Sequence, residues 1–202
     1  MKRSAGVRGL VVLVLLALGI PDPASAFDAE QTFAKGTFVV SGEGAYGWQF
    51  DLEKKQDFSA IEAWDVGVRF GLLPFETFGK TSPLYGSVEV GLEPLYQRYL
   101  EPQRAFWAGL AAVIRYHFLG LGRVVPYLEL AGSAGGTDLS LPEIRSTFAF
   151  LLFGGGGASV FVDDRAAVYA GYRFQHVSNG NTSRPNRGFE SHVGVMGFSF
   201  LF

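Results

Sequence analysis

The sequence contains no cysteine, and this absence excludes disulfide bonds, thiol nucleophiles and thiolate metal sites. It contains only three histidines, with no recurrent spacing to carboxylates that would indicate a metal site, so we expect neither a metal nor another cofactor. After residue 26, no apolar run is long enough to cross a bilayer as a helix. Burial of side chains and backbone hydrogen bonding must therefore hold the fold together.

The first 26 residues have the pattern of a secretory signal peptide. They begin with basic residues, continue with an apolar run over residues 10–20 and end in small residues at 24–26, where signal peptidase cleaves. We expect one mature domain over residues 27–202. Removing the leader takes three basic and one acidic residue from the 17 and 19 of the whole chain, which leaves a formal net charge of −4. An acidic chain has no basic footprint for nucleic acid.

The composition favours a transmembrane β-barrel. The chain has 27 glycines, 19 phenylalanines, 8 tyrosines and 3 tryptophans, spread along its length. Aromatic rings girdle both membrane interfaces of such barrels, and glycine permits close strand packing. From Trp64 to Leu72, apolar residues alternate with polar or small ones, which is the period of a strand. Strands are predicted near residues 36–49, 61–73, 85–98, 105–118, 126–136, 147–161, 166–178 and 189–202.

We therefore predict an all-β fold: an eight-stranded antiparallel transmembrane β-barrel with up-and-down meander topology and an apolar outer wall. An eight-stranded interior is filled by side chains, which argues against a conducting pore. The charges of the polar face then point into the lumen, where opposite signs pair. They are Glu43, Asp65, Arg69, Glu89, Glu93, Arg115, Glu129 and Arg173.

The last strand indicates how the barrel is oriented. It ends in Phe202, with Phe200 and Phe198 on the same face, which resembles the signal that outer-membrane barrels present to the barrel assembly machinery. Both termini should then lie in the periplasm. The connections near 50–60, 99–104, 137–146 and 179–188 are accordingly predicted to be extracellular.

The segment before and after the last of these connections gathers candidate catalytic residues. His176 and Ser178 continue the apolar, membrane-facing parity of their strand, and Glu190 has the membrane-facing parity of the next strand. A serine becomes a nucleophile when a histidine accepts its proton, and a carboxylate orients that histidine. The alternative is structural, since polar side chains at the rim of a barrel cost little.

The same segment resembles the outer-membrane lipid A 3-O-deacylase family (PagL type). The motif is His-x-Ser-Asn followed by Pro-Asn-x-Gly-x-Glu, with the family's spacing between histidine and glutamate. The matching residues are His176, Ser178, Asn179, Pro185, Asn186, Gly188 and Glu190.

The resemblance implies roles for several of these residues. Ser178 would be the nucleophile, His176 the general base and then acid, and Glu190 the orienting carboxylate. Asn186 would donate to the oxyanion, with Asn179 and Gly180 in support. The family usually has glycine two residues after the asparagine of His-x-Ser-Asn, where this chain has Asn181 and carries Gly180 one residue earlier. The second oxyanion donor is therefore left open.

The resemblance also implies an activity: hydrolysis, without cofactor, of the ester-linked acyl chain at the 3-position of lipid A (lipopolysaccharide) in the outer leaflet. Outer-membrane lipid would surround the wall. The competing hypothesis is a non-enzymatic small barrel, structural or adhesin-like, in which Ser178→Ala would be silent. The arginines in or near the outer connections either pair with lipid A phosphates or stay solvated. They are Arg98, Arg104, Arg145, Arg184 and Arg187.

Overall fold

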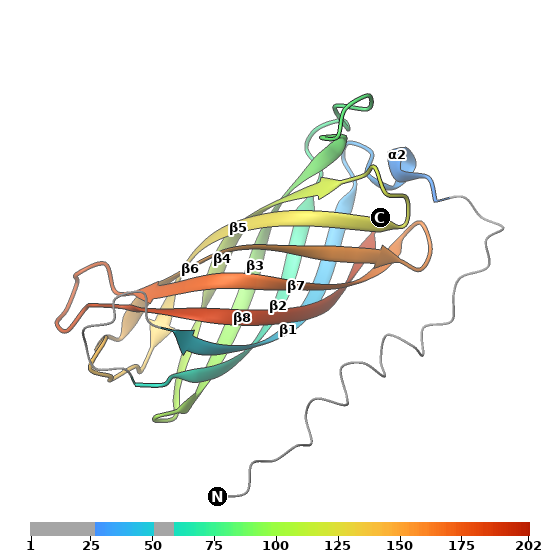
Figure 1. Cartoon of the computed structure of the whole chain (residues 1–202). Helices are drawn as coiled ribbons and strands as arrows, with labels where there is room; N and C mark the ends of the chain where they lie inside the picture. The colour runs from blue at the N-terminus through green and yellow to red at the C-terminus, as the bar shows by residue number, and fades with distance from the viewer. Residues whose placement is uncertain (1–26, 51–58) are drawn as a thin grey trace, which may run out of the picture.

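The strands form one closed wall. The computed structural model describes residues 27–50 and 59–202, in which eight antiparallel strands follow one another in meander order and β8 pairs with β1 (Figure 1). The predicted signal peptide, residues 1–26, lies outside the described residues, as does most of the 50–60 connection. The strands are β1 (Phe38–Phe50), β2 (Glu62–Leu72), β3 (Gly86–Glu101), β4 (Ala105–Phe118), β5 (Val124–Thr137), β6 (Phe148–Phe161), β7 (Ala166–Ser178) and β8 (Phe189–Leu201).

The predicted fold is confirmed, and the predicted strand ends lie within three residues of the observed ones. Closure matters because a bilayer offers no water to an unpaired strand edge. At the seam, the backbones of Phe38 and Phe202 exchange hydrogen bonds of 3.2 and 2.9 Å. The sequence analysis did not predict the short helix α2 (Ala29–Thr32), whose first turn is capped by the Asp28 carboxylate. None of the described helices is long and apolar enough to cross a membrane.

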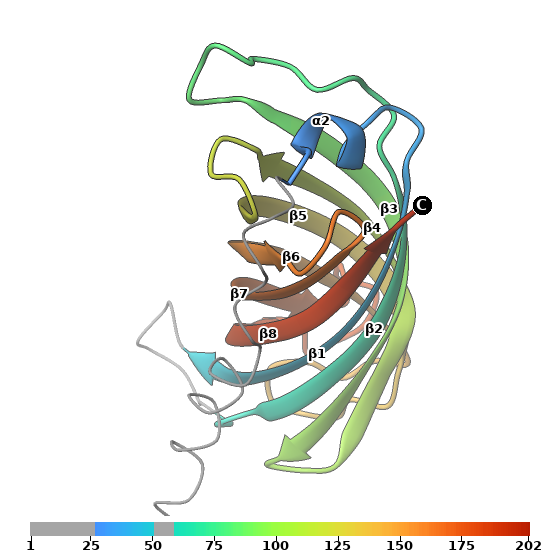
Figure 2. The same cartoon turned by 90° about the vertical axis from the view of Figure 1, so that its right-hand side faces the viewer.

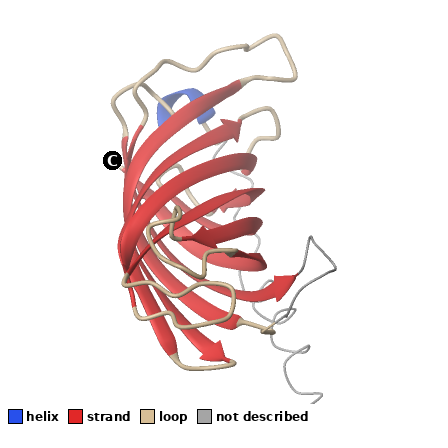
Figure 3. Ribbon diagram, turned by 90° about the vertical axis from the view of Figure 1, so that its left-hand side faces the viewer, coloured by secondary structure: helices blue, strands red, loops and turns tan. Residues whose placement is uncertain are grey.

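The two ends of the barrel differ. One end carries residues 59–61 and the connections 102–104, 138–147 and 179–188, and we call it the loop end; Figure 3 shows it facing the viewer. The opposite end, which faces the viewer in Figure 2, carries α2 and the C-terminus. Because the eight strands alternate in direction, the chain enters β1 and leaves β8 at the same end of the barrel, opposite the loop end.

Strand alternation separates an apolar outside from a polar inside. Along β2, Val66, Val68 and Phe70 are exposed on the outer wall, whereas Asp65 and Arg69 are buried in the lumen. An apolar outer wall suits a hydrocarbon environment, so the barrel is inverted relative to a water-soluble one.

Charged side chains fill the middle of the lumen, as predicted. Arg173 binds Glu43 and Glu129, with the Nε–Oε1 contact to Glu129 at 2.6 Å. Arg115 donates to Glu129 at 2.7 Å, and Arg69 donates to Glu93 at 2.8 Å. These opposite charges are buried together and pair with one another, which offsets much of the cost of keeping ions away from water.

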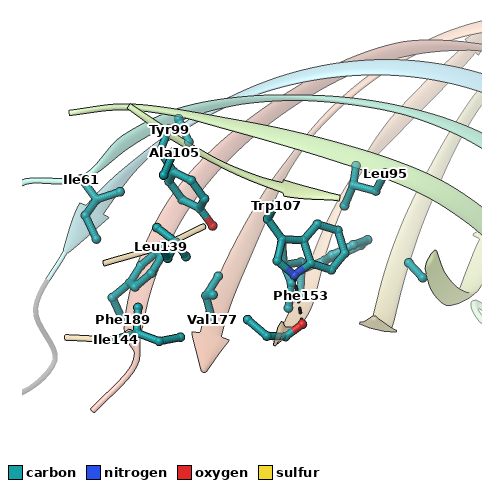
Figure 4. Close-up of a cluster of buried hydrophobic side chains, with 14 of the residues drawn as sticks. Ile61, Leu95, Tyr99, Ala105, Trp107, Leu139, Ile144, Phe153, Val177 and Phe189 are labelled. Carbon is teal, nitrogen blue, oxygen red and sulfur yellow. Dashed lines mark hydrogen bonds between the residues drawn. The ribbon is translucent and has the colours of Figure 1, made fainter. Parts of the chain in front are cut away.

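Apolar clusters that the sequence analysis did not predict close the lumen on both sides of the charges. Near the loop end, Trp107, Val177 and Leu139 belong to one buried cluster, drawn in Figure 4. The Trp107 indole Nε1 donates to the Ala149 carbonyl at 3.0 Å, which satisfies its only polar atom. The second cluster includes Phe33, next to α2, at the other end. A filled interior agrees with the expectation that this barrel is not a pore.

Candidate active site

His176 and Ser178 lie on the outer wall at the loop end of β7. Their side chains are partly exposed, while the residues between and before them, Val177 and Gln175, are buried in the lumen. An apolar residue facing a polar lumen would argue against this parity, but Val177 packs into the apolar cluster of Figure 4. The cluster therefore explains why the chain has valine at this position.

Glu190 meets His176 across the β7–β8 ladder, where the two residues are direct partners. The His176 Nδ1 and Glu190 Oε1 atoms are 3.0 Å apart. Because an ionised carboxylate only accepts hydrogen bonds, Nδ1 carries the hydrogen and donates it, and in the neutral imidazole Nε2 then has a free lone pair. The pair is only partly exposed, with 31% and 23% of the two side chains accessible, so water does not fully screen it.

Gly188, across the hairpin, lies against both His176 and Ser178. A Cβ atom at Gly188 would lie 3.0 Å from His176 Cε1 and 3.3 Å from Ser178 Cβ. The glycine also has a φ of +72°, a conformation that other residues adopt only with strain. Both reasons require glycine here, since any side chain would enter the space that the imidazole and the serine share. Between these two side chains the described structure contains no hydrogen bond, which free enzymes often form only with substrate.

Glu143, from the β5–β6 loop, fixes Gly188, and the sequence analysis missed it. Its backbone carbonyl accepts hydrogen bonds from the amides of Arg187 and Gly188, at 2.8 and 3.1 Å. Its fully buried carboxylate accepts from Ser59 and Gln49. One residue thus ties three parts of the loop end to the turn that carries the site. No spacing rule links position 143 to position 188, so local sequence carries no signal for it.

The predicted oxyanion residues form the turn above Ser178. The Asn186 Oδ1 atom accepts the backbone N–H of Asn179 at 2.8 Å, and its Nδ2 donates to the side chain of Asn181 at 3.1 Å. Asn179 is buried and binds Ser183 through its side chain, so its contribution is to hold the turn. Gly180 and Asn181 both adopt positive φ, of 61° and 64°. Asparagine tolerates this conformation better than other side chains, which explains how it occupies the place where the family has glycine.

Apolar side chains surround the polar groups. Phe150 and Leu152 on β6 are the ladder partners of Ser178 and His176, and both are exposed on the outer wall. On the other side, Phe50 stacks on the His192 ring with centroids 4.0 Å apart. The His192 Nδ1 atom is 2.6 Å from the Tyr172 hydroxyl. The site is therefore a polar group set in the apolar outer surface of the barrel, and among the described residues no cluster of potential metal ligands occurs.

The fold and the site define a class of molecule: an outer-membrane β-barrel that carries serine, histidine and carboxylate side chains on its outer wall. The family model described as Lipid A 3-O-deacylase (PagL) matches residues 42–199. The chain belongs to this family, whose members are lipid A deacylases and hence hydrolases. A search of curated protein sequences finds no match.

Solved structures agree on the fold. The outer membrane enzyme PagL is 19% identical, with a TM-score of 0.55, and the match covers 79% of this chain and 97% of that one. Neisserial surface protein A is 18% identical, with a TM-score of 0.58, and the match covers 83% of this chain and 100% of that one. At these identities, the two likenesses show that the chain shares the fold of these proteins.

Proposed function

We propose that this protein is a lipid A 3-O-deacylase that works as a serine esterase with Ser178, His176 and Glu190 as its triad. The observation that carries the proposal is the hydrogen bond of 3.0 Å from His176 Nδ1 to Glu190, on the same face as Ser178. It orients the imidazole and leaves Nε2 available as a base beside the serine. Glu190 also stabilises the imidazolium that forms during the reaction.

The reaction proceeds in two halves. His176 Nε2 takes the proton of Ser178 as the hydroxyl oxygen attacks the ester carbonyl, and the tetrahedral intermediate collapses to an acyl-serine. His176 returns the proton to the sugar oxygen, which leaves as the 3-hydroxyl group. Water, deprotonated by the same nitrogen, then attacks the acyl-serine, and the fatty acid is released with Ser178 regenerated.

The intermediate's oxyanion needs hydrogen-bond donors close to Ser178. Asn186 is the donor we favour, because one hydrogen of its Nδ2 is engaged by Asn181 and the other is available. The backbone N–H groups of Gly180 and Asn181 are candidates for the second donor, since the positive φ of both residues turns the chain sharply just after Ser178 and Asn179. Loss of one such donor costs roughly 100- to 1,000-fold in kcat.

The surroundings of the site favour a lipid as substrate. Phe150 is the ladder partner of Ser178 on the apolar outer wall, and its ring also lies against Gly180. Leu152 and Phe174 continue that wall away from the loop end. An acyl chain in the adjacent leaflet can lie along these side chains with its ester at the rim. This requires that the loop end faces the cell exterior, where lipid A forms the outer leaflet.

The test is mass spectrometry of lipid A incubated with the purified protein in detergent. The wild-type chain should remove one acyl chain, specifically from the 3-position, whereas Ser178→Ala and His176→Ala should reduce turnover by at least about 10,000-fold. Glu190→Ala should keep residual activity, because the carboxylate orients rather than attacks. The double variant Ser178→Ala/His176→Ala should be little worse than Ser178→Ala, since the two groups act as a unit.

The matched control is Ser191→Ala. Ser191 is next to Glu190 in β8, but its side chain is buried on the lumen side. This variant should deacylate like the wild type. Turnover by Ser178→Ala at the wild-type rate would end the triad assignment and favour the non-enzymatic barrel.

A further inference from the structure

A pocket opens at the loop end, beside the proposed triad. It lies between the β5–β6 and β7–β8 loops and has a volume of about 720 Å³. Its two arginines come from different loops, Arg145 from the first and Arg184 from the second. Six residues that shape its chemistry are Asp138, Arg145, Thr147, Phe148, Thr182 and Arg184.

The charge of the pocket favours an anion. Arg145 and Arg184 are exposed, and neither guanidinium pairs with a carboxylate within residues 27–50 and 59–202. The acidic group of the pocket, Asp138, accepts the backbone N–H of Phe106 at 2.7 Å, so part of its charge is already compensated. Arginine has a planar fork of donors that matches a phosphate group and binds it through two parallel hydrogen bonds.

The backbone that carries both arginines is held in place. The Arg145 amide donates to the Pro185 carbonyl at 3.2 Å, and the Arg145 carbonyl accepts from the Ser183 hydroxyl at 2.5 Å. Asn179, the residue after Ser178, donates to Ser183 in turn. Because these bonds hold the two loops to each other, binding an anion here requires little ordering of the loops.

The pocket lies within the reach of one lipid head group from Ser178. Phe148 lines the pocket. Phe150 lies two residues further along β6, on the same face, and is the ladder partner of Ser178. Two residues of a strand span about 7 Å. The rings of Phe148 and Phe150 pack edge to face with centroids 5.2 Å apart, so an apolar surface connects the pocket with the site.

From this arrangement we propose that Arg145 and Arg184 bind a phosphate monoester of the glycolipid head group while the ester of the same molecule lies at Ser178. Lipid A is a phosphorylated glucosamine disaccharide, so it carries the required group on the polar side of its acyl chains. This proposal rests on the proposed function. It adds that the phosphate group of the substrate fixes the position of the sugar relative to Ser178.

Binding is tested in the Ser178→Ala background, which separates it from turnover. The probes are bisphosphorylated lipid A, the same lipid stripped of its phosphates, and inorganic phosphate as competitor, with the protein in detergent micelles. Replacing both arginines, Arg145→Gln and Arg184→Gln, should weaken binding of the phosphorylated lipid about 100-fold, roughly 10-fold for each charge-assisted contact. Binding of the stripped lipid should not change.

The control is Arg104→Gln, in the β3–β4 turn, which removes an exposed arginine outside the pocket. It should bind both lipids like its parent. Equal loss for both lipids in the double arginine variant, or no loss at all, would overturn the proposal. If inorganic phosphate displaces the phosphorylated lipid at equal concentration, the pocket is a free-phosphate site and the head-group assignment is wrong.

Turnover in the Ser178-intact protein distinguishes the two proposals. If the wild-type chain deacylates neither lipid, the proposed function is wrong. The binding measurements then still decide whether the two arginines bind the phosphate group. If it deacylates both lipids with the same kcat/KM and the double arginine variant matches it, the function stands and the pocket does not recognise phosphate.

Discussion

Gly188→Ala is the substitution that tests the site's architecture most directly, because it adds one carbon atom at the point where the site is packed. The new Cβ would lie 2.7 Å from the Val177 carbonyl oxygen and 3.0 Å from His176 Cε1. The carbonyl belongs to a strand paired on both sides and cannot retreat. The imidazole or the 179–188 turn must therefore move.

The size of the effect has two parts. A Cβ at a φ of +72° costs about 1–2 kcal/mol of stability. Separately, a misplacement of catalytic groups by about 1 Å reduces the rate by as much as 100-fold. That is about 2.7 kcal/mol in the activation free energy. We expect kcat/KM to fall by about 30- to 100-fold in Gly188→Ala, with most of the loss in kcat.

Gly122→Ala is the control that separates the effect on stability from the effect on the catalytic rate. Gly122 lies in the β4–β5 turn at the opposite end, has a similar φ of +62°, and has no atom within 4 Å of the position of a Cβ. Both variants should unfold at lower urea concentration, Gly188→Ala by the larger amount because its Cβ also meets the Val177 carbonyl, but only Gly188→Ala should lose deacylation of lipid A. Wild-type kcat/KM in Gly188→Ala would refute the reasoning that the packing on Gly188 aligns His176 with Ser178.

Two further predictions concern the barrel. A nitroxide label at Phe174 should have high oxygen accessibility in a reconstituted membrane, because this side chain faces outward. A label at Gln175 should have low oxygen accessibility, because this side chain is buried in the lumen. The reverse order would contradict a site that faces the membrane. Arg173→Leu removes one of the cations that bind Glu43 and Glu129, and Arg69 and Arg115 compensate for it only in part, so the free energy of unfolding in urea should fall by up to about 3–5 kcal/mol. An unchanged unfolding midpoint would mean that the lumen charges are solvated.

Much of the site could be predicted because it lies within one hairpin. His176, Ser178 and Glu190 are close in sequence, and the period of two assigns their side chains to the outer wall as soon as their apolar neighbours are assigned there. The same alternation predicted that the charged residues face the lumen. What it could not predict is Val177 in an apolar cluster, since that cluster is assembled from several strands and from the β5–β6 loop.

The sequence by itself determined the eight strands, their inside and outside faces, and the three candidate catalytic residues, because alternation and short-range spacing are local properties of the chain. Only the tertiary structure decided which distant residues support the site. Closure of the barrel brings the β5–β6 loop beside the β7–β8 loop, so that Glu143 fixes Gly188 and Arg145 joins Arg184. Such contacts depend on which loops meet at the loop end of the barrel, and no local pattern in the sequence predicts which loops these are.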